Sequence, residues 1–301
     1  MPIHLFSVSG MMLEPVQFLF SEDIIRYLQS LGNPSADNLF VAITTISSQP
    51  VYFLLASLIF WCFSKRTGIR ALYVILFSAF TAIFAKNLFN MPRPPEYLQK
   101  IQENEFGFPS GHAQVSSSFW GYAGLSIKNK CIVFVGIIAI ISVSFSRLYL
   151  GVHYVGDVVG GIIFGLSIAL IFFKIEPTIT GRLERLSSIS KYSAAVALPV
   201  ILVAIAATQP GLLKEQAEIG MVMAGIGVGY LLEEERVRLT DAKNNKQRIK
   251  RAIVGVAVLG IIYLISSMLL LINPNFTFFK YGALGFASAF IAPWVITKMN
   301  V

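Results

Sequence analysis

The chain has 301 residues, of which 55% are hydrophobic and only 13% charged, and its mean hydropathy is +0.69. A soluble domain carries about 25% charged residues, so this composition excludes an ordinary soluble protein and indicates an integral membrane protein. The net charge of +8 does not call for a nucleic-acid partner, because Lys and Arg gather in the cytoplasmic loops of membrane proteins.

Apolar segments long enough to cross a bilayer recur along most of the chain. A spanning helix needs about 20 mostly apolar residues. We therefore predict an all-α fold, a polytopic transmembrane helical bundle with about nine spans, at residues 45–64, 69–89, 112–127, 131–148, 155–173, 193–208, 218–232, 251–272 and 280–298.

The segments outside these spans suggest four parts. Residues 1–44 form an N-terminal segment, in which "PVQFLFSEDIIRYLQSLG" has apolar residues at helical spacing interrupted by charges, as in an interfacial helix that does not span. Every unusual polar residue at membrane depth falls within residues 1–173, and residues 45–173 form a core that carries three polar clusters. A polar cytoplasmic linker at 174–192 leads to a four-span extension at 193–301.

The distribution of basic residues predicts the orientation. Of the 24 Lys and Arg residues, 17 follow spans 1, 3, 5 and 7 or lie at the C-terminus. The positive-inside rule places that side in the cytoplasm. We therefore expect a non-cytoplasmic N-terminus and a cytoplasmic C-terminus.

Three polar clusters fall on the predicted non-cytoplasmic side. In the first, Lys86 ends the second span, and Arg93 follows within "NMPRPP", whose prolines cannot continue a helix. Taken alone, Lys86 reads as a snorkelling side chain and Arg93 as a loop charge. In the second, Ser110 is a candidate N-cap and Gly111 allows close backbone approach, at a helix start suited to anions. His112 lies in the first turn of that helix.

The third cluster is "SRLYLGVHYVGD". His153 and Asp157 are four residues apart, which on a helix puts them on one face. The carboxylate can fix the imidazole tautomer and leave the other ring nitrogen free as a nucleophile. Arg147 can offer a bidentate fork to phosphate. Taken alone, the pair could be a structural His–Asp contact.

Together, the clusters supply three cations, backbone donors and two imidazoles, which is the equipment of an oxyanion site with an acid–base pair. No Cys/His set or carboxylate cluster suited to a metal accompanies them, so we expect no metal and no cofactor.

The spacing of these residues resembles that of the type 2 phosphatidic acid phosphatase family, which shares its site with vanadium haloperoxidases and bacterial acid phosphatases. The resemblance implies a metal-independent phosphatase in which His153 attacks phosphorus to form a phosphohistidine, Asp157 orients His153, and His112 protonates the leaving oxygen. It also implies that the phosphoryl oxygens are held by Lys86, Arg93, Ser110, Gly111 and Arg147.

The topology resembles one branch of that family. Nine spans with an outside N-terminus, together with "EFGFPSGHA", are similar to glucose-6-phosphatase and the sphingoid-phosphate phosphatases. We expect a membrane lipid phosphate as substrate, with the site on the non-cytoplasmic face. A soluble sugar phosphate is the alternative substrate, and a lipid-phosphate transporter or binding protein is the alternative of another class. The sequence leaves the oligomeric state open.

Overall fold

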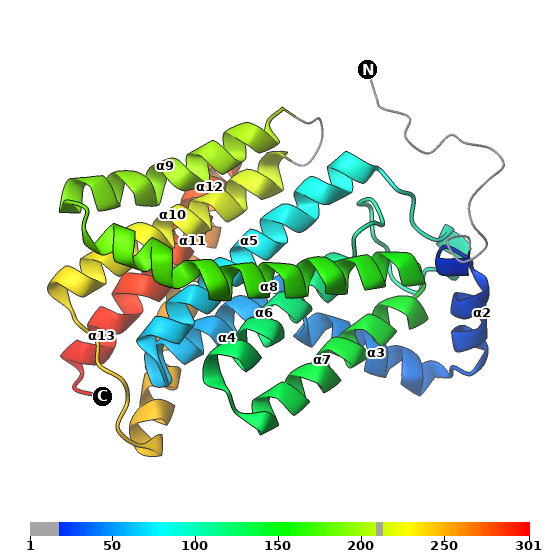
Figure 1. Cartoon of the computed structure of the whole chain (residues 1–301), viewed down its shortest axis with the longest axis horizontal. Coiled ribbons are helices and arrows are strands. Elements are labelled where there is room, and N and C mark those ends of the chain that lie inside the picture. Colours follow the sequence, from blue (N-terminus) through cyan, green and yellow to red (C-terminus); the bar gives the residue numbers. More distant parts are fainter. Residues whose placement is uncertain (1–17, 209–212) are drawn as a thin grey trace.

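The computed structural model describes residues 18–208 and 213–301, and every regular element within those residues is a helix (Figure 1). This confirms the predicted all-α fold. The longer helices are α2 (Asp23–Ser30), α3 (Pro34–Ile46), α4 (Gln49–Cys62), α5 (Lys65–Phe89), α6 (Gly111–Ile127), α7 (Lys130–Tyr149), α8 (Val155–Glu184), α9 (Ser188–Ala206), α10 (Leu213–Arg236), α11 (Asn245–Ile272), α12 (Thr277–Phe286) and α13 (Ala292–Lys298).

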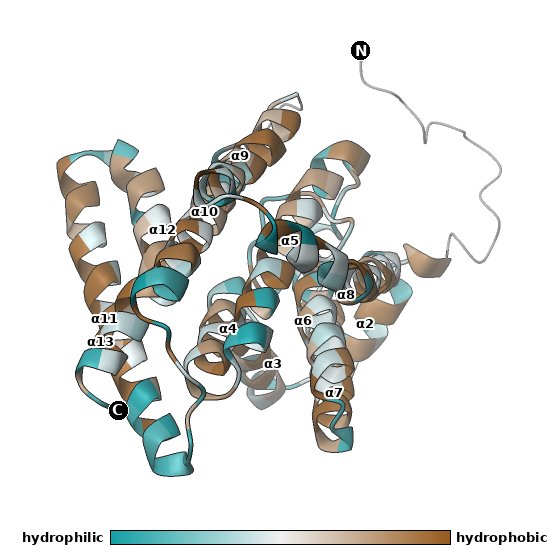
Figure 2. Cartoon of the chain, turned by 60° about the vertical axis from the view of Figure 1, so that its left-hand side comes forward, coloured by the Kyte–Doolittle hydropathy of each residue, from teal (hydrophilic) through white to brown (hydrophobic). Residues whose placement is uncertain are grey.

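Six segments in the described part of the chain are long and apolar enough to cross a membrane: α5, α7, α8, α9, α11 and Pro274–Lys298. The bent pair α3–α4 would make a seventh. Only 11% of the most apolar stretch of α9 and 17% of that of α11 is buried inside the protein, so their apolar faces are left for lipid. Figure 2 shows apolar residues along the helices and many of the hydrophilic ones near helix ends. The protein is therefore an integral, multi-pass membrane protein.

The remaining two expected spans are α6 and α10. With 17 residues, α6 lies at the lower limit of spanning length, and α10 carries charged residues at both ends. Both pack against other helices of the bundle: α6 contacts α7 and α8, and α10 contacts α9 and α12.

The first expected span, 45–64, differs in the structure, because it is divided between α3 and α4, which meet at 51°. The Ser47 hydroxyl donates to the Ile43 carbonyl at 2.8 Å, and Pro50 in the first turn of α4 has no backbone N–H to continue α3. The sequence pattern predicts helix throughout this region, but it does not indicate the local bonds that end α3.

The predicted linker 174–192 is mostly helical. α8 continues to Glu184 and α9 begins at Ser188. Glu176, on the extension of α8, pairs with Arg70 and Arg66 on α5. The change to polar residues therefore marks the expected membrane boundary, not the end of the helix.

The described part of the N-terminal segment closes one end of the core. α2 has eight residues, too few to span, in agreement with the prediction of a non-spanning helix; residues 1–17 of this segment lie outside the described residues. Gln29 donates to the carbonyls of Leu98 at 2.8 Å and Tyr149 at 2.9 Å. Asp37 on α3 accepts from the Tyr149 hydroxyl at 2.6 Å. Thus α2 and α3 are tied to the loops that carry the polar clusters.

Glycines bring α6 and α8 close together. A Cβ at Gly161 would lie 2.6 Å from the Ser110 carbonyl, and one at Gly165 would lie 2.3 Å from the Gln114 carbonyl. Small residues four apart let two membrane helices approach along their backbones. This close packing aligns the beginning of α6 with the beginning of α8.

The C-terminal helices pack against the same core. The hydroxyls of Ser57 and Ser288 are 2.8 Å apart, and the Trp61 indole donates to the Ser288 carbonyl at 2.8 Å. Ser288 lies in a π-helical turn, Ala287–Ile291, between α12 and α13. These buried polar contacts join the extension to α4.

Replacing Gly165 with Val should destabilise the fold, because the side chain would collide with the α6 backbone. Overpacking typically costs about 1–3 kcal/mol. The thermal unfolding midpoint of the purified protein in detergent should fall for Gly165→Val. It should stay near the parent value for Gly181→Val, where an added Cβ meets no atom within 4 Å among the described residues. Equal losses in the two variants would contradict the packing argument.

Candidate active site

The three polar clusters meet at one end of the bundle, next to α2 (Figure 1). The Ser110 amide donates to the Asp157 carbonyl at 2.9 Å, which joins the start of α6 to the first turn of α8. The Gly107 amide donates to the Met91 carbonyl at 2.8 Å, which joins the segment before α6 to the loop after α5. Segments far apart in sequence are thus connected by backbone bonds.

The three predicted cations are Lys86, Arg93 and Arg147; their side chains are buried and paired with carboxylates. The Lys86 ammonium donates to Glu105 at 2.5 Å. The Arg147 guanidinium donates to Glu103 at 2.5 Å, and that of Arg93 lies 3.6 Å from the other oxygen of Glu103. One loop therefore provides the negative partners of all three cations.

The His153–Asp157 pair forms, but His153 does not lie on a helix. His153 precedes α8, in a turn where Gly151 has a φ of +69°, whereas Asp157 lies in the first turn of α8. Asp157 Oδ2 is 3.3 Å from His153 Nδ1 and accepts from the Tyr154 amide at 2.9 Å. The prediction that His153 and Asp157 share one helix face is therefore wrong. The Asp157 carboxylate instead caps the start of α8 and contacts the His153 imidazole, which precedes the helix.

The other ring nitrogen of His153 faces a cation. Arg93 Nη1 lies 3.1 Å from His153 Nε2 and also donates to the Val152 carbonyl at 2.8 Å. Because a guanidinium has donors only, Nε2 acts as the acceptor and Nδ1 carries the proton toward Asp157. Burial, followed by the charges of Arg93 and Arg147, lowers the pKa of His153 below its usual range. The imidazole is therefore neutral, with a lone pair on Nε2.

The Pro-Ser-Gly-His turn begins α6 as predicted. Ser110 is the N-cap residue with extended backbone, but its hydroxyl makes no capping bond; Ser110 Oγ is buried and has no hydrogen-bond partner among the described residues. Gly111 opens the helix, and His112 follows it with a partly exposed side chain. The unpaired Arg147 Nε and Asp157 Oδ1 are likewise buried without a partner in the described chain.

Sequence reasoning missed Glu103, Glu105 and Thr44. Thr44, on α3, accepts from Arg147 at 2.7 Å. Burial alone would raise the pKa of Glu103, but the charge and hydrogen bond of Arg147, then the charge of Arg93, lower it overall. The available signal was two glutamates two residues apart, directly before the Pro-Ser-Gly-His turn. Nothing in the sequence indicates that Thr44 reaches the site.

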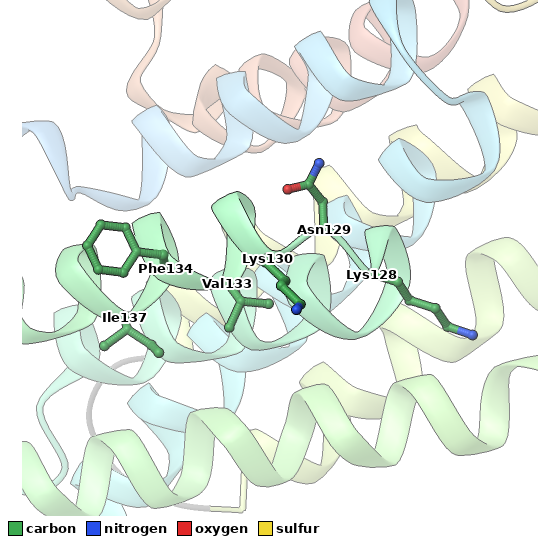
Figure 3. A pocket seen from close by; sticks show the side chains of 6 residues that line it. All are labelled: Lys128, Asn129, Lys130, Val133, Phe134 and Ile137. Carbon is green, nitrogen blue, oxygen red and sulfur yellow. The ribbon is translucent and has the colours of Figure 1, made fainter.

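A surface pocket lies elsewhere, at the turn between α6 and α7 (Figure 3). It is lined by Lys128, Asn129, Lys130, Val133, Phe134 and Ile137. Since α6 has 17 residues, the pocket is roughly 24 Å along that helix from His112. It is therefore separate from the cluster of predicted site residues.

Within residues 18–208 and 213–301, no group of three or more His, Cys, Asp or Glu side chains is arranged to hold a metal ion. The carboxylates nearest the predicted site are paired with cations instead. Metal independence of the reaction stays a prediction.

Comparison with known proteins identifies two matched regions. Residues 67–180 match the PAP2 superfamily, and residues 217–301 match the PAP2 superfamily phosphatase transmembrane extension. The first match contains every predicted site residue, and the second covers most of the four-span extension.

Individual relatives match parts of the chain. An undecaprenyl-diphosphatase of Sulfolobus acidocaldarius is 34% identical over 98 residues, 32% of this chain and 46% of that protein. A probable sphingosine-1-phosphate phosphatase of Dictyostelium discoideum is 26% identical over 178 residues, 54% of this chain and 43% of that protein. The chain thus spans less than half the length of these two curated relatives.

A solved structure also resembles the chain. The crystal structure of a transmembrane PAP2-type phosphatidylglycerolphosphate phosphatase from Bacillus subtilis has a TM-score of 0.49 and 23% sequence identity, covering 56% of this chain and 89% of that one. Both matched regions of the sequence belong to one superfamily, and together they cover more than half of this chain. The chain is therefore a member of the PAP2 superfamily.

Proposed function

We propose that this protein is an integral membrane phosphatase that hydrolyses lipid phosphates, either phosphomonoesters or diphosphates. The observation that carries the proposal is the His153 imidazole, which is held by Asp157 at Nδ1 and directs its Nε2 lone pair toward Arg93, among three buried cations. Binding a phosphate requires the cations but not an oriented imidazole. This pair therefore favours turnover over a transporter or binding protein.

In the proposed mechanism, a phosphoryl group enters among Lys86, Arg93 and Arg147, and Arg93 exchanges its bond with His153 for one with a phosphoryl oxygen. His153 Nε2 attacks phosphorus while the bond to the leaving oxygen breaks, and His112 gives that oxygen a proton. His112 then takes a proton from water, the water oxygen attacks phosphorus, and the P–N bond breaks to release phosphate. The cations stabilise the equatorial oxygens in both steps.

The donors at the start of α6 complete the proposed phosphate site. Ser110 Oγ is buried without a partner in the described residues, and the Gly111 amide belongs to the open first turn of a helix. Helix N-termini bind anions because their first N–H groups lack partners and the dipole is positive there. We assign Ser110 and Gly111 to the phosphoryl oxygens.

A lipid substrate is favoured by the apolar surface beside the site. Phe89, at the end of α5, is 39% exposed and packs against Phe108, with ring centroids 5.1 Å apart. Phe108 precedes the Pro-Ser-Gly-His turn and contacts Phe164 on α8. An acyl or prenyl chain could lie on this aromatic surface while its phosphate reaches the cations. The curated relatives are named for undecaprenyl diphosphate and sphingosine 1-phosphate, which are both lipids.

The first test is phosphate release in detergent with EDTA, from a panel of lipid monophosphates, a polyprenyl diphosphate and glucose 6-phosphate. We expect release from one or more lipids without added metal, because three cations already supply the charge that a divalent ion would bring. Turnover of glucose 6-phosphate alone would favour the sugar-phosphate alternative. Activity restored only by a divalent ion would refute the metal-free mechanism.

Substitution of His112 and substitution of His153 should impair different steps of the reaction. Removal of a general acid costs about 10²–10⁴ in rate, and the loss is greatest for a poor leaving group. In His112→Ala, the rate of hydrolysis should therefore fall far more for lipid substrates than for an activated aryl phosphate. It should also accumulate an acid-labile phosphoenzyme, because the same imidazole activates water.

His153→Ala should form no phosphoenzyme with either substrate. The measurement is a rapid quench in alkali with labelled aryl phosphate, followed by counting of label on the protein. Labelling of His153→Ala equal to that of the parent would show that another residue is the nucleophile.

The orientation is a further part of the proposal: the site and the N-terminus face away from the cytoplasm, and the C-terminus faces it. A cysteine at the exposed position Gln102, with Cys62 and Cys131 replaced, should react with an impermeant thiol reagent applied to intact cells. As a matched control, a Cys62→Ala variant that keeps the exposed Cys131, in the first turn of α7, should react only after permeabilisation. The reverse pattern would invert the topology.

A further inference from the structure

Arg147, to which the proposed function assigns a phosphoryl oxygen, is contacted by a side chain from the N-terminal segment. Its Nη1 donates to the Thr44 hydroxyl at 2.7 Å, and both residues are buried. We propose that Thr44 is a positioning residue, which orients the Arg147 guanidinium so that its Nε–Nη2 edge faces the phosphoryl group. The inference rests on the proposed function, because it concerns the same site, but Thr44 precedes the matched region 67–180.

The three nitrogen atoms of the Arg147 guanidinium have different surroundings. Nη1 contacts Thr44, Nη2 donates to Glu103 at 2.5 Å, and Nε is buried without a partner among the described residues. The Nε–H and one Nη2 N–H point the same way along one edge of a guanidinium, and such an edge binds two oxygens of a carboxylate or phosphate in parallel. Thr44 therefore holds the nitrogen that lies outside this edge and leaves both donors of the edge to an anion.

The two partners of Arg147 respond differently to an arriving phosphate. The Glu103 side chain carries a negative charge and is 24% exposed, so a phosphoryl oxygen can take its place on Nη2. The Thr44 hydroxyl is neutral, buried and bonded to Nη1, where a phosphate on the Nε–Nη2 edge does not compete for it. Arg147 therefore keeps a fixed contact while its anionic partner is exchanged.

A neutral acceptor suits this position for a second reason. A hydroxyl satisfies one N–H of Arg147 without offsetting its charge, so the attraction for phosphoryl oxygens is retained. A carboxylate at the same place would pair permanently with the guanidinium and weaken that attraction. The contact thus fixes the direction of the cation and preserves its charge.

α3 is itself fixed against α7, which carries Arg147. Asp37, Phe40 and Thr44 are spaced i, i+3 and i+7, on one face of α3. Asp37 accepts from the Tyr149 hydroxyl at 2.6 Å, and the Phe40 ring centroid lies 4.4 Å from that of Tyr149. Thr44 is also β-branched, so few rotamers are open to its side chain. Its hydroxyl is therefore held at a set place beside Arg147.

The test compares two substitutions of Thr44 in the full chain in detergent. Thr44→Val removes the hydroxyl and keeps a β-branched side chain, whereas Thr44→Ser keeps the hydroxyl. Thr45→Val is the matched control, because Thr45 is the next residue of α3, is exposed, and donates its hydroxyl to the Val41 carbonyl at 2.8 Å. The measurements are kcat and KM for an aryl phosphate, and the inhibition constant of inorganic phosphate.

We expect Thr44→Val to raise the inhibition constant of inorganic phosphate and the KM of the aryl phosphate. Its kcat/KM should fall about 10- to 100-fold, because misplacement of a substrate-positioning group by about 1 Å can cost about 10² in rate. Thr44→Ser should stay near the parent in all three constants, since the acceptor is retained. Thr45→Val should match the parent.

The effect should also act through Arg147. Arg147→Gln removes the guanidinium, so adding Thr44→Val to it should change phosphate binding no further, although each substitution alone weakens that binding. The readout is the rise in thermal unfolding midpoint that inorganic phosphate produces in the parent, the two single variants and the double variant. This readout does not require the variants to be active.

A folded Thr44→Val protein with a lower unfolding midpoint but unchanged KM and phosphate inhibition would overturn the inference, because Thr44 would then only stabilise the fold. An equal loss in Thr44→Ser, or a full further loss in the Arg147→Gln background, would overturn it as well. If Thr44→Val is misfolded, Thr44→Ala supplies the comparison. A parent that neither hydrolyses a phosphomonoester nor binds inorganic phosphate would refute the proposed function, and this inference with it.

An active parent with an unaffected Thr44→Val variant would refute the inference alone and leave the proposed function standing. Weaker phosphate binding in Thr44→Val, with Thr44→Ser and Thr45→Val near the parent, supports the positioning role.

Discussion

The side chains of Lys86, Arg93 and Arg147 are buried at one end of a membrane bundle and require negative partners, because an uncompensated buried ion costs several kcal/mol. The cations come from α5, from the loop after it and from α7, so no single helix can neutralise them. The loop before α6 brings Glu103 and Glu105 to all three. The fold of this end of the molecule therefore depends on where that loop is held.

Two kinds of contact hold it. Gly161 and Gly165 let α8 lie against the backbone of α6, which sets the two helix starts side by side and allows the Ser110 amide to reach the Asp157 carbonyl. On the other side, Gln29 and Asp37 tie α2 and α3 to the loops after α5 and α7. The close helix packing provides rigidity, and the N-terminal helices close the end.

The sequence was sufficient for the helical membrane fold and for the set of residues that converge, because apolar runs and motif spacing are local patterns. It was not sufficient for contacts that depend on tertiary structure. The break after Ile46 comes from the Ser47 hydroxyl and Pro50, and the contact between Thr44 and Arg147 joins residues 103 positions apart. His153 was expected on a helix because i, i+4 spacing resembles a helix face, but the same spacing serves a carboxylate that caps α8 and reaches back.

The pairing of cations with loop carboxylates links stability to recognition. An open cluster of three buried cations would bind phosphate more tightly but would destabilise the empty protein, and it would attract any anionic headgroup in the bilayer. Carboxylates on a half-exposed loop neutralise the cluster in the absence of substrate. In the proposed function, a phosphate that binds competes with these carboxylates, so some affinity is given up for the stability of the empty protein. Asp157 differs from these two glutamates because it is fully buried, bonded to the Tyr154 amide and directed at His153. A carboxylate held in that way is fixed independently of the loop before α6, which fits the orienting role that the proposed function gives to Asp157.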